Sequence, residues 1–349
     1  MRAGVCGGLG EIADNGGLVG ISGDTSEGGP AAPSELKVGC RLCPRGCGVD
    51  RSAATGFCGM PDRVTIARAA LHMWEEPCIS GNAGSGTVFF SGCTLRCVFC
   101  QNYSISTMRQ GTEITVDRLA EIFLELQDMG AWNINLVTPT HYVPQIIRAL
   151  DTAKGRGLSL PVVYNTSGYE RVETLRMLDG YVDIYLPDFK YVDRGLAGKY
   201  SGAPDYFEIA SAALAEMVRQ VPETVFREPE EALSAQMLRG VIVRHLLLPG
   251  CLMDSKRVVR YLYETYGDRI YMSLMNQYTP LPQVAEHFPE LNCKVKRKSY
   301  DKLVDYALDL GVVNAFIQEG AAARESFIPD FCPETASQVV GYEAYKSSM

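Results

Sequence analysis

The chain has 349 residues, 46% of them apolar and 21% charged, and a formal net charge of −8 at pH 7. This length and apolar content predict a folded protein of one large or two ordinary domains, and the acidic balance gives no general attraction to nucleic acid or to an anionic membrane. No apolar run approaches the roughly 20 residues that cross a bilayer and the N-terminus lacks the layout of a secretion signal, so we expect a cytoplasmic protein.

The first segment, residues 1–36, is rich in glycine and carries only scattered apolar residues. We predict that it is disordered, because it buries too little surface to offset the entropy of ordering. Residues 37–62 form a cysteine-rich segment that we interpret as metal-binding, since clustered thiols in a reducing compartment more often hold a metal than a disulfide. An α/β domain follows at 63–330, and a C-terminal tail at 331–349.

Within the α/β domain, short apolar runs typical of strands alternate with amphipathic stretches typical of helices. The predicted strands are 87–92, 133–137, 161–165, 182–186, 241–248, 270–275 and 314–318. The clearest predicted helices are 115–130, 205–220 and 301–311. This alternation predicts parallel strands joined by crossover helices, and six or seven such units predict an α/β barrel, complete or partial.

Polar residues follow the predicted strands in chain order, where a parallel barrel collects its chemistry. They are Cys93, Cys97 and Cys100, then Thr138, Thr140 and His141, then Asn165 and Ser167, then Asp188 and Lys190, and finally Arg244 and His245. Because the carboxyl ends of parallel strands meet at one end of a barrel, we predict that these residues form one site.

The cysteine triplet lies in the stretch SGCTLRCVFCQN, with spacings of three and then two residues. Thiolates suit zinc, copper(I) or iron–sulfur clusters, and a structural zinc requires a fourth ligand that no nearby spacing provides. A [4Fe–4S] cluster held by three cysteines leaves one iron open to another molecule. The alternatives are buried structural cysteines or a zinc site completed by a distant residue.

These residues resemble the radical S-adenosylmethionine (SAM) superfamily, whose members carry Cys-x3-Cys-x-aromatic-Cys after the first strand of a partial barrel. Cys93, Cys97, Phe99 and Cys100 match that motif. The resemblance implies a partial (β/α)6 barrel in which SAM chelates the open iron of a [4Fe–4S] cluster. Reduction of the cluster then cleaves SAM to a 5′-deoxyadenosyl radical that abstracts hydrogen, with Phe99 packed near the adenine.

Residues from about Cys40 to Tyr278 resemble the branch of pyruvate formate-lyase activating enzymes. The resemblance assigns SAM contacts to NTSGY and VRHLLLPG and site-facing residues to PDFK; the residues are Asn165 and Ser167, Arg244 and His245, and Asp188 and Lys190. Each motif also has a purely structural alternative. NTSGY is then a turn, PDFK contains a surface ion pair, and the arginine of VRHLLLPG is a structural residue of its strand.

One element departs from this branch. Activating enzymes carry Gly-Gly-Glu after the second strand, where this chain reads VTPTH. Thr138, Thr140 and His141 are candidates for replacement hydrogen bonds to SAM, although no glycine here allows an equally close backbone approach. His141 is also a candidate for substrate proton transfer, or a structural histidine.

The second cysteine group has four members among arginines, and these residues are Cys40, Cys43, Cys47 and Cys58 with Arg41, Arg45 and Arg51. An auxiliary iron–sulfur cluster is favoured over zinc, because only the first cysteine pair has the spacing of a zinc ribbon. Reactive or disulfide-bonded cysteines are the third alternative. We interpret the arginines as offsetting thiolate charge or docking an acidic electron donor, or else as solvated surface charge.

The favoured function is an oxygen-sensitive oxidoreductase of anaerobic metabolism that abstracts hydrogen from a glycine of a partner glycyl-radical enzyme. The resemblance implies a flavodoxin- or ferredoxin-like reductant. Radical modification of a peptide or a small metabolite is the alternative enzyme function. The non-enzymatic alternative is an iron–sulfur or zinc protein that transfers electrons.

Overall fold

A computed structural model describes residues 39–227, 235–318, 331 and 336–340 of the chain. The leader predicted at 1–36 lies outside the described residues. No helix in the described ranges is long and apolar enough to cross a membrane.

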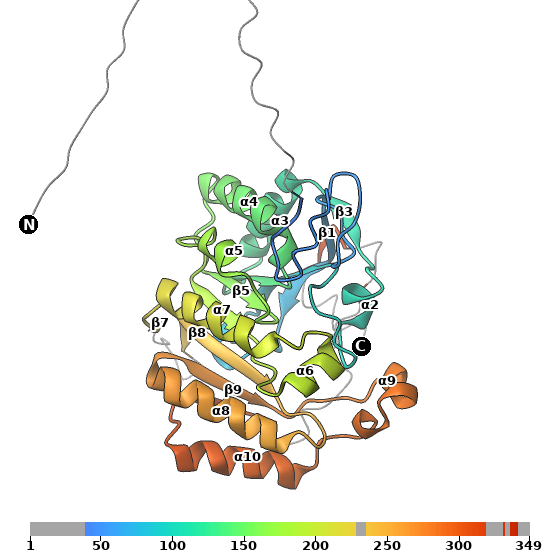
Figure 1. The fold of residues 1–349 in the computed structure, drawn as a ribbon. Helices are drawn as coiled ribbons and strands as arrows, with labels where there is room; N and C mark the ends of the chain where they lie inside the picture. The colour runs from blue at the N-terminus through green and yellow to red at the C-terminus, as the bar shows by residue number, and fades with distance from the viewer. Residues whose placement is uncertain (1–38, 228–234, 319–330, 332–335, 341–349) are drawn as a thin grey trace, which may run out of the picture. The chain divides into compact units, whose positions relative to one another are not determined.

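Seven parallel strands lie side by side in chain order (Figure 1). They are β2 (Ser85–Phe90), β4 (Ile134–Val137), β5 (Val162–Thr166), β6 (Ile184–Pro187), β8 (Gln236–Leu246), β9 (Tyr271–Met275) and β10 (Ala315–Ile317). The strand path has two free ends, at β10 and at β11 (Val339–Val340), so the sheet is unclosed. The predicted partial α/β barrel is confirmed, with each predicted parallel strand found close to its expected place.

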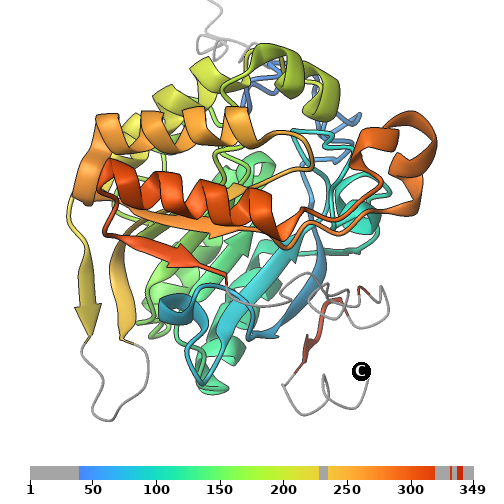
Figure 2. The ribbon, with the colours of Figure 1, turned by 90° about the horizontal axis from the view of Figure 1, so that it is seen from below.

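Helices cover the outer face of this sheet (Figures 1 and 2). The long ones are α3 (Val116–Asp128), α4 (Val143–Gly155), α7 (Tyr206–Gln220), α8 (Leu252–Tyr266) and α10 (Arg297–Leu310). The shorter ones are α2 (Tyr103–Ser106), α5 (Val172–Arg176), α6 (Arg194–Ser201) and α9 (Pro282–His287), with 3₁₀ turns η1 (Thr140–Tyr142), η2 (Gly267–Arg269) and η3 (Pro289–Leu291). Helix α3 begins as its sequence predicts, because the Thr115 side chain accepts a hydrogen bond from the Arg118 amide.

The sequence analysis did not identify the antiparallel strands. Strand β1 (Val64–His72) pairs antiparallel with β2, β3 (Thr112–Ile114) pairs with β1, and β7 (Val225–Arg227) pairs with β8. Strand β1 is buried along most of its length and therefore shows no apolar–polar alternation. Strand β11 pairs with β1, so part of the predicted C-terminal tail extends the sheet.

The barrel interior is filled from below by the link between β1 and β2. This link contains the short helix α1 (Pro77–Ser80), whose Cys78 and Ile79 pack against apolar residues that point inward from β5, β6 and β8. Those residues are Val163, Ile184, Leu186, Met237 and Ile242. The link therefore forms an apolar floor, and Cys78 is a core residue of it.

The cysteine-rich segment packs on the barrel through its arginines. Arg51 is 6% exposed and donates to the carbonyl oxygens of Met60, Pro61 and His141. Arg45 donates to the carbonyl oxygens of Thr94, at 2.9 Å, and Gly202, at 2.8 Å. The interpretation of Arg51 as a solvated surface charge is therefore wrong, because its guanidinium group is buried and, like that of Arg45, anchors the segment to the barrel.

Candidate active site

A cavity of about 240 Å³ lies at the carboxyl ends of the parallel strands. Seven predicted site residues line it, and these are Cys97, Phe99, Cys100, Asn165, Asp188, Lys190 and Arg244. Residues that the sequence analysis did not single out complete the wall, among them His72, Trp74, Glu75, Tyr191 and Gln277. Half of the twelve predicted strand-end residues thus line one cavity.

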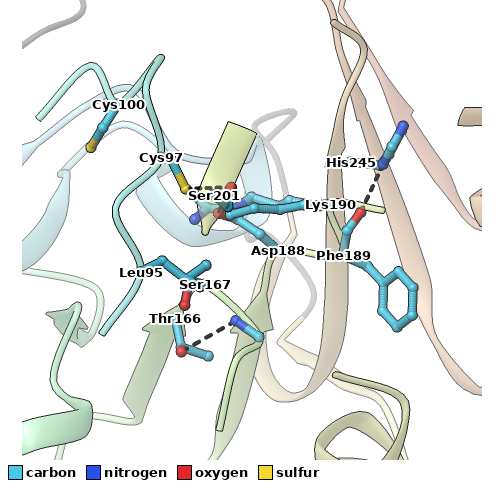
Figure 3. A network of polar contacts seen from close by, with 12 residues as sticks. Leu95, Cys97, Cys100, Thr166, Ser167, Asp188, Phe189, Lys190, Ser201 and His245 are labelled. Carbon is cyan, nitrogen blue, oxygen red and sulfur yellow. Dashed lines mark hydrogen bonds and ion pairs between the residues drawn. The ribbon is translucent and has the colours of Figure 1, made fainter. Parts of the chain in front are cut away.

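The alternation of side chains along β8 separates two neighbouring predicted residues. Arg244 faces the cavity, whereas His245 points to the opposite face, where its Nδ1 donates to the carbonyl oxygen of Phe189 at 2.7 Å (Figure 3). Burial lowers the pKa of His245 to about 4, so the ring is neutral at pH 7. The structure therefore does not bring His245 to the cavity.

A network of charged and amide side chains spans the cavity wall. Arg244 donates from Nε to Asp188 Oδ1 at 3.0 Å, from Nη1 to Glu75 Oε2 at 3.1 Å and from Nη2 to Asn165 Oδ1 at 2.5 Å. Lys190 Nζ lies 2.7 Å from Asp188 Oδ2. Two cations thus balance two carboxylates, and the interpretation of Asp188 and Lys190 as a surface pair is wrong because both side chains are largely buried.

The charges of this network set its protonation states. Burial alone would raise the pKa of Asp188, but the neighbouring Lys190 and Arg244 outweigh burial and hold that pKa below its usual value. Burial acts on Lys190 in the opposite sense, and the Asp188 carboxylate holds its pKa above the ordinary value. Both groups are therefore charged at pH 7.

Glu75 is a residue of the cavity network that the sequence analysis missed. Its Oε1 accepts from Asn165 Nδ2 at 3.2 Å and from Asn135 Nδ2 at 3.1 Å, in addition to the ion pair with Arg244. The stretch WEEP places two carboxylates directly before the helix that starts at Pro77. That pair of acids was the available signal.

The cysteine loop follows β2 and presents Cys97 and Cys100 to the cavity, while Cys93 lies half-buried at its start. Ser201 Oγ donates to Cys97 Sγ at 3.0 Å (Figure 3). Ser106 Oγ donates to Cys100 Sγ at 3.3 Å. Burial raises the pKa of Cys100 to about 11 and that of Cys93 further, so these thiols stay protonated until a metal displaces the proton.

Within the described ranges, no group of three or more His, Cys, Asp or Glu side chains lies close enough together to bind a metal ion as it stands. This holds for the cysteine loop and for the cysteine-rich segment. The donor chemistry of the loop nevertheless fits an iron–sulfur cluster with an open position. Two of its thiols line a cavity whose described wall carries no further cysteine. Phe99 lines the same cavity and packs edge-on against Tyr278.

The TPTH segment lies beside the cavity rather than in its wall. Thr138 has a φ of 59°, in the left-handed region that β-branched residues rarely adopt, and its amide donates to Asn165 O. Thr140 Oγ1 donates to Glu170 Oε1 at 2.5 Å. His141 Nε2 donates to Ser91 O at 2.7 Å, and burial lowers its pKa to about 3.

Ser167 also stays outside the cavity wall. Its carbonyl oxygen lies 2.8 Å from the hydroxyl of Tyr206 and Asp188 O lies 2.9 Å from it, so the two carbonyl oxygens share the single proton of that hydroxyl. Tyr206 thereby links the NTSGY and PDFK loops. The backbone of Ser167 thus serves to position Asp188.

The four cysteines of the N-terminal group are all free thiols in the structure. Cys43 and Cys58 are buried, Cys40 is half-buried and Cys47 is exposed. The segment approaches the cysteine loop so closely at Gly92 that a Cβ there would lie 2.2 Å from Met60 Cγ. The two cysteine groups therefore belong to segments that pack against each other.

The structure is an open α/β barrel with a cavity at the strand ends, and this cavity lies between a loop of three cysteines and a charged network. This is the architecture expected of a barrel enzyme that uses a metal cluster. Comparison with known proteins identifies its kind. Residues 87–250, from β2 to the loop after β8, match the model of the radical SAM superfamily. A [4Fe–4S] cluster and SAM are the cofactors of such an enzyme.

The chain is similar to the uncharacterized protein MJ0674 of Methanocaldococcus jannaschii, with 28% identity over 78% of this chain and 76% of that protein. Among solved structures, SuiB of Streptococcus suis bound to its precursor peptide SuiA is 14% identical with a TM-score of 0.43, over 65% of this chain and 46% of that chain. Methylornithine synthase (PylB) is 14% identical with a TM-score of 0.46, over 83% and 74%. The chain thus spans about half the length of SuiB.

Proposed function

We propose that this radical SAM enzyme abstracts a hydrogen atom from a glycine of a partner glycyl-radical enzyme. The proposal is supported by the motifs PDFK and VRHLLLPG, which resemble those of activating enzymes. The observation that carries it is that Asp188, Lys190 and Arg244 from these motifs line one cavity with Cys97 and Cys100.

The charged network has the donors to hold the amino-acid end of SAM. A guanidinium group has five N–H donors, and Arg244 uses three of them on Asp188, Glu75 and Asn165. Two donors are left for a carboxylate, and the guanidinium is already oriented by its three partners. We assign Arg244 and Asn165 to SAM binding, and Phe99 to contact with the adenine.

Asp188 and Lys190 hold the other side of the cavity. Their ion pair and the Tyr206 hydroxyl fix the PDFK loop, so that Lys190 lines the cavity with its charge retained. The cluster and SAM supply the 5′-deoxyadenosyl radical when bound, and the chain's own residues orient SAM and exclude water.

The proposal is tested with anaerobically reconstituted protein, SAM and dithionite, using pyruvate formate-lyase as the probe substrate. We expect 5′-deoxyadenosine to form and a glycyl radical to appear in the electron paramagnetic resonance (EPR) spectrum of the mixture. Formation of 5′-deoxyadenosine without a glycyl radical on this or another glycyl-radical enzyme would instead favour a peptide or small metabolite as substrate.

We further propose that Cys40, Cys43, Cys47 and Cys58 ligate an auxiliary [4Fe–4S] cluster that receives electrons from a flavodoxin- or ferredoxin-like donor. The spacing of the four thiols and the packing of their segment on the cysteine loop support this assignment. Iron and sulfide are counted in the quadruple Ala variant and in a Cys78→Ala control. Loss of about four irons in the quadruple variant alone is expected. Loss of a single zinc, or no change in metal content, would contradict it.

A further inference from the structure

Ser201 directs its side chain at a cysteine of the cluster loop. It is the last residue of α6, it is fully buried, and its hydroxyl lies 3.0 Å from Cys97 Sγ (Figure 3). No motif marks this serine in the sequence, because it lies 104 residues from Cys97 in the chain. The contact is created by the packing of α6 over the cysteine loop.

The direction of each hydrogen bond follows from the single proton of a hydroxyl group. Ser201 donates its proton to Cys97 Sγ, and it therefore accepts from the hydroxyl of Tyr191, which lies 2.9 Å away. Tyr191 is 1% exposed and also lines the cavity. A directed chain thus runs from the cavity wall through Tyr191 and Ser201 to the sulfur of Cys97.

The end of α6 is held in register with the cysteine loop by two further contacts. Arg45 donates both to Gly202 O, next to Ser201, and to Thr94 O in the loop. The Val98 amide donates to Tyr200 O at 2.9 Å. Because helix end and loop are tied together from both sides, the Ser201 hydroxyl is held at hydrogen-bond distance from the sulfur.

Hydrogen bonds to ligating sulfurs are one of the means by which proteins set the potential of an iron–sulfur cluster. A donated proton stabilises negative charge on the sulfur, and the reduced cluster carries more of that charge than the oxidised one. A second hydroxyl behind the first polarises the donor and strengthens this effect.

We propose that Ser201, backed by Tyr191, is a positioning residue that makes the cluster of this enzyme easier to reduce through its hydrogen bond to Cys97. The inference rests on the cluster of the radical SAM superfamily and not on the proposed glycyl substrate. A redox titration of the cluster therefore tests this inference without testing the glycyl substrate, and either proposal can fail while the other holds.

The test is a redox titration of the cluster with dithionite and mediators, followed by EPR, in the quadruple Ala background at Cys40, Cys43, Cys47 and Cys58. Ser201→Ala is expected to lower the ratio of reduced to oxidised cluster at a fixed potential by about tenfold, which for a one-electron couple is about 59 mV. Tyr191→Phe keeps the donor and is expected to shift the potential in the same direction by less. Ser201→Thr, which keeps a hydroxyl, is expected to restore the wild-type potential.

Ser211→Ala is the matched control, since this serine lies on the neighbouring α7 and its hydroxyl makes no hydrogen bond in the described structure. An unchanged potential in Ser201→Ala with full iron content would overturn the proposal. If Ser201→Ala fails to hold a cluster, Tyr191→Phe decides, because it leaves the contact with Cys97 in place. In that case a wild-type potential in Tyr191→Phe overturns the proposal, and so does a shift in Ser211→Ala as large as the one in Tyr191→Phe.

Discussion

The carboxylate of Glu75 and the guanidinium of Arg244 meet 3.1 Å apart inside the barrel, although 169 residues separate them in the chain. The pair joins the link that fills the barrel from below to the strand whose arginine we assign to SAM. It connects the apolar floor of the barrel with its charged cavity. The network therefore serves both the stability of the barrel and the shape of the site.

Arg244→Ala is expected to lower the free energy of unfolding of the apo-protein by about 3–5 kcal/mol, because it leaves the buried Glu75 carboxylate without its cation and Asp188 with Lys190 alone. Glu75→Gln keeps a hydrogen-bonding side chain and is expected to cost less. Urea unfolding measures both values. Equal stability of Arg244→Ala and wild type would contradict this expectation. It would mean that water solvates the Glu75 carboxylate when the arginine is removed.

The same substitution tests the binding assignment. Arg244→Ala is expected to weaken SAM binding by at least about tenfold, equivalent to about 1.4 kcal/mol, because it removes charge-assisted hydrogen bonds to a carboxylate. Equilibrium binding to the anaerobically loaded protein measures the affinity, with Arg41→Ala, an exposed residue, as control. Unchanged affinity in Arg244→Ala would remove Arg244 from the SAM site.

Thr138→Gly is expected to leave the melting temperature unchanged or raise it. The left-handed φ of 59° costs a β-branched residue about 1–2 kcal/mol, which glycine avoids at a smaller entropic cost. Thr138→Ala keeps the Cβ and therefore keeps the strain, so it serves as the control. A glycine variant less stable than the alanine variant would contradict this explanation.

The buried carboxyl of Glu170 is expected to make the apo-protein less stable as the pH rises. Burial raises its pKa from 4.5 to about 7 in the folded protein. Below pH 4.5 both states are protonated and the group contributes nothing; between pH 4.5 and about 7 the unfolded state ionises first, so stability falls, and it levels off above about 7. The loss amounts to about 3 kcal/mol.

Melting curves of wild type and Glu170→Gln across this pH range measure the effect. The variant is expected to lose the decline, because an amide does not ionise and still accepts from Thr140. Parallel pH profiles for the two proteins would mean that Glu170 is not the titrating group.

Arg51→Met is expected to loosen the cysteine-rich segment. The substitution leaves buried carbonyl oxygens of Met60, Pro61 and His141 without their donor, at a cost of about 1–3 kcal/mol for each. Hydrogen exchange read by mass spectrometry should accelerate in residues 39–62 and not in β5 or β6. Uniform exchange in variant and wild type would show that the segment is held by other contacts.

The parallel strands and part of the cavity wall were predictable, because each strand is a short apolar run that polar residues follow directly. Asn165, at the end of its strand, was found by this rule, whereas Arg244 was assigned through the resemblance of VRHLLLPG to the activating enzymes. His245 was placed in the site with Arg244 because the two residues share one motif. Successive side chains on a strand point to opposite faces, so the sequence already indicated that only one of the two faces the cavity.

Glu75 and Ser201 were not predictable in the same way. Glu75 reaches the cavity because the link between β1 and β2 folds into the barrel, and no local pattern distinguishes such a link from a surface loop. Ser201 contacts Cys97 through helix packing between distant parts of the chain. Contacts of this kind depend on the tertiary arrangement, which sequence spacing does not encode.

The most direct test of the account is EPR of the reduced cluster with and without SAM, in protein whose four N-terminal cysteines are replaced by Ala so that one cluster is observed. We expect the spectrum to change on addition of SAM, and SAM labelled with ¹⁷O in its carboxylate to broaden it, because one iron lacks a protein ligand and binds that group. A spectrum that excess SAM leaves unaltered, or a cluster whose fourth iron already carries a side chain, would contradict the assignment of Cys93, Cys97 and Cys100 as its complete protein ligand set.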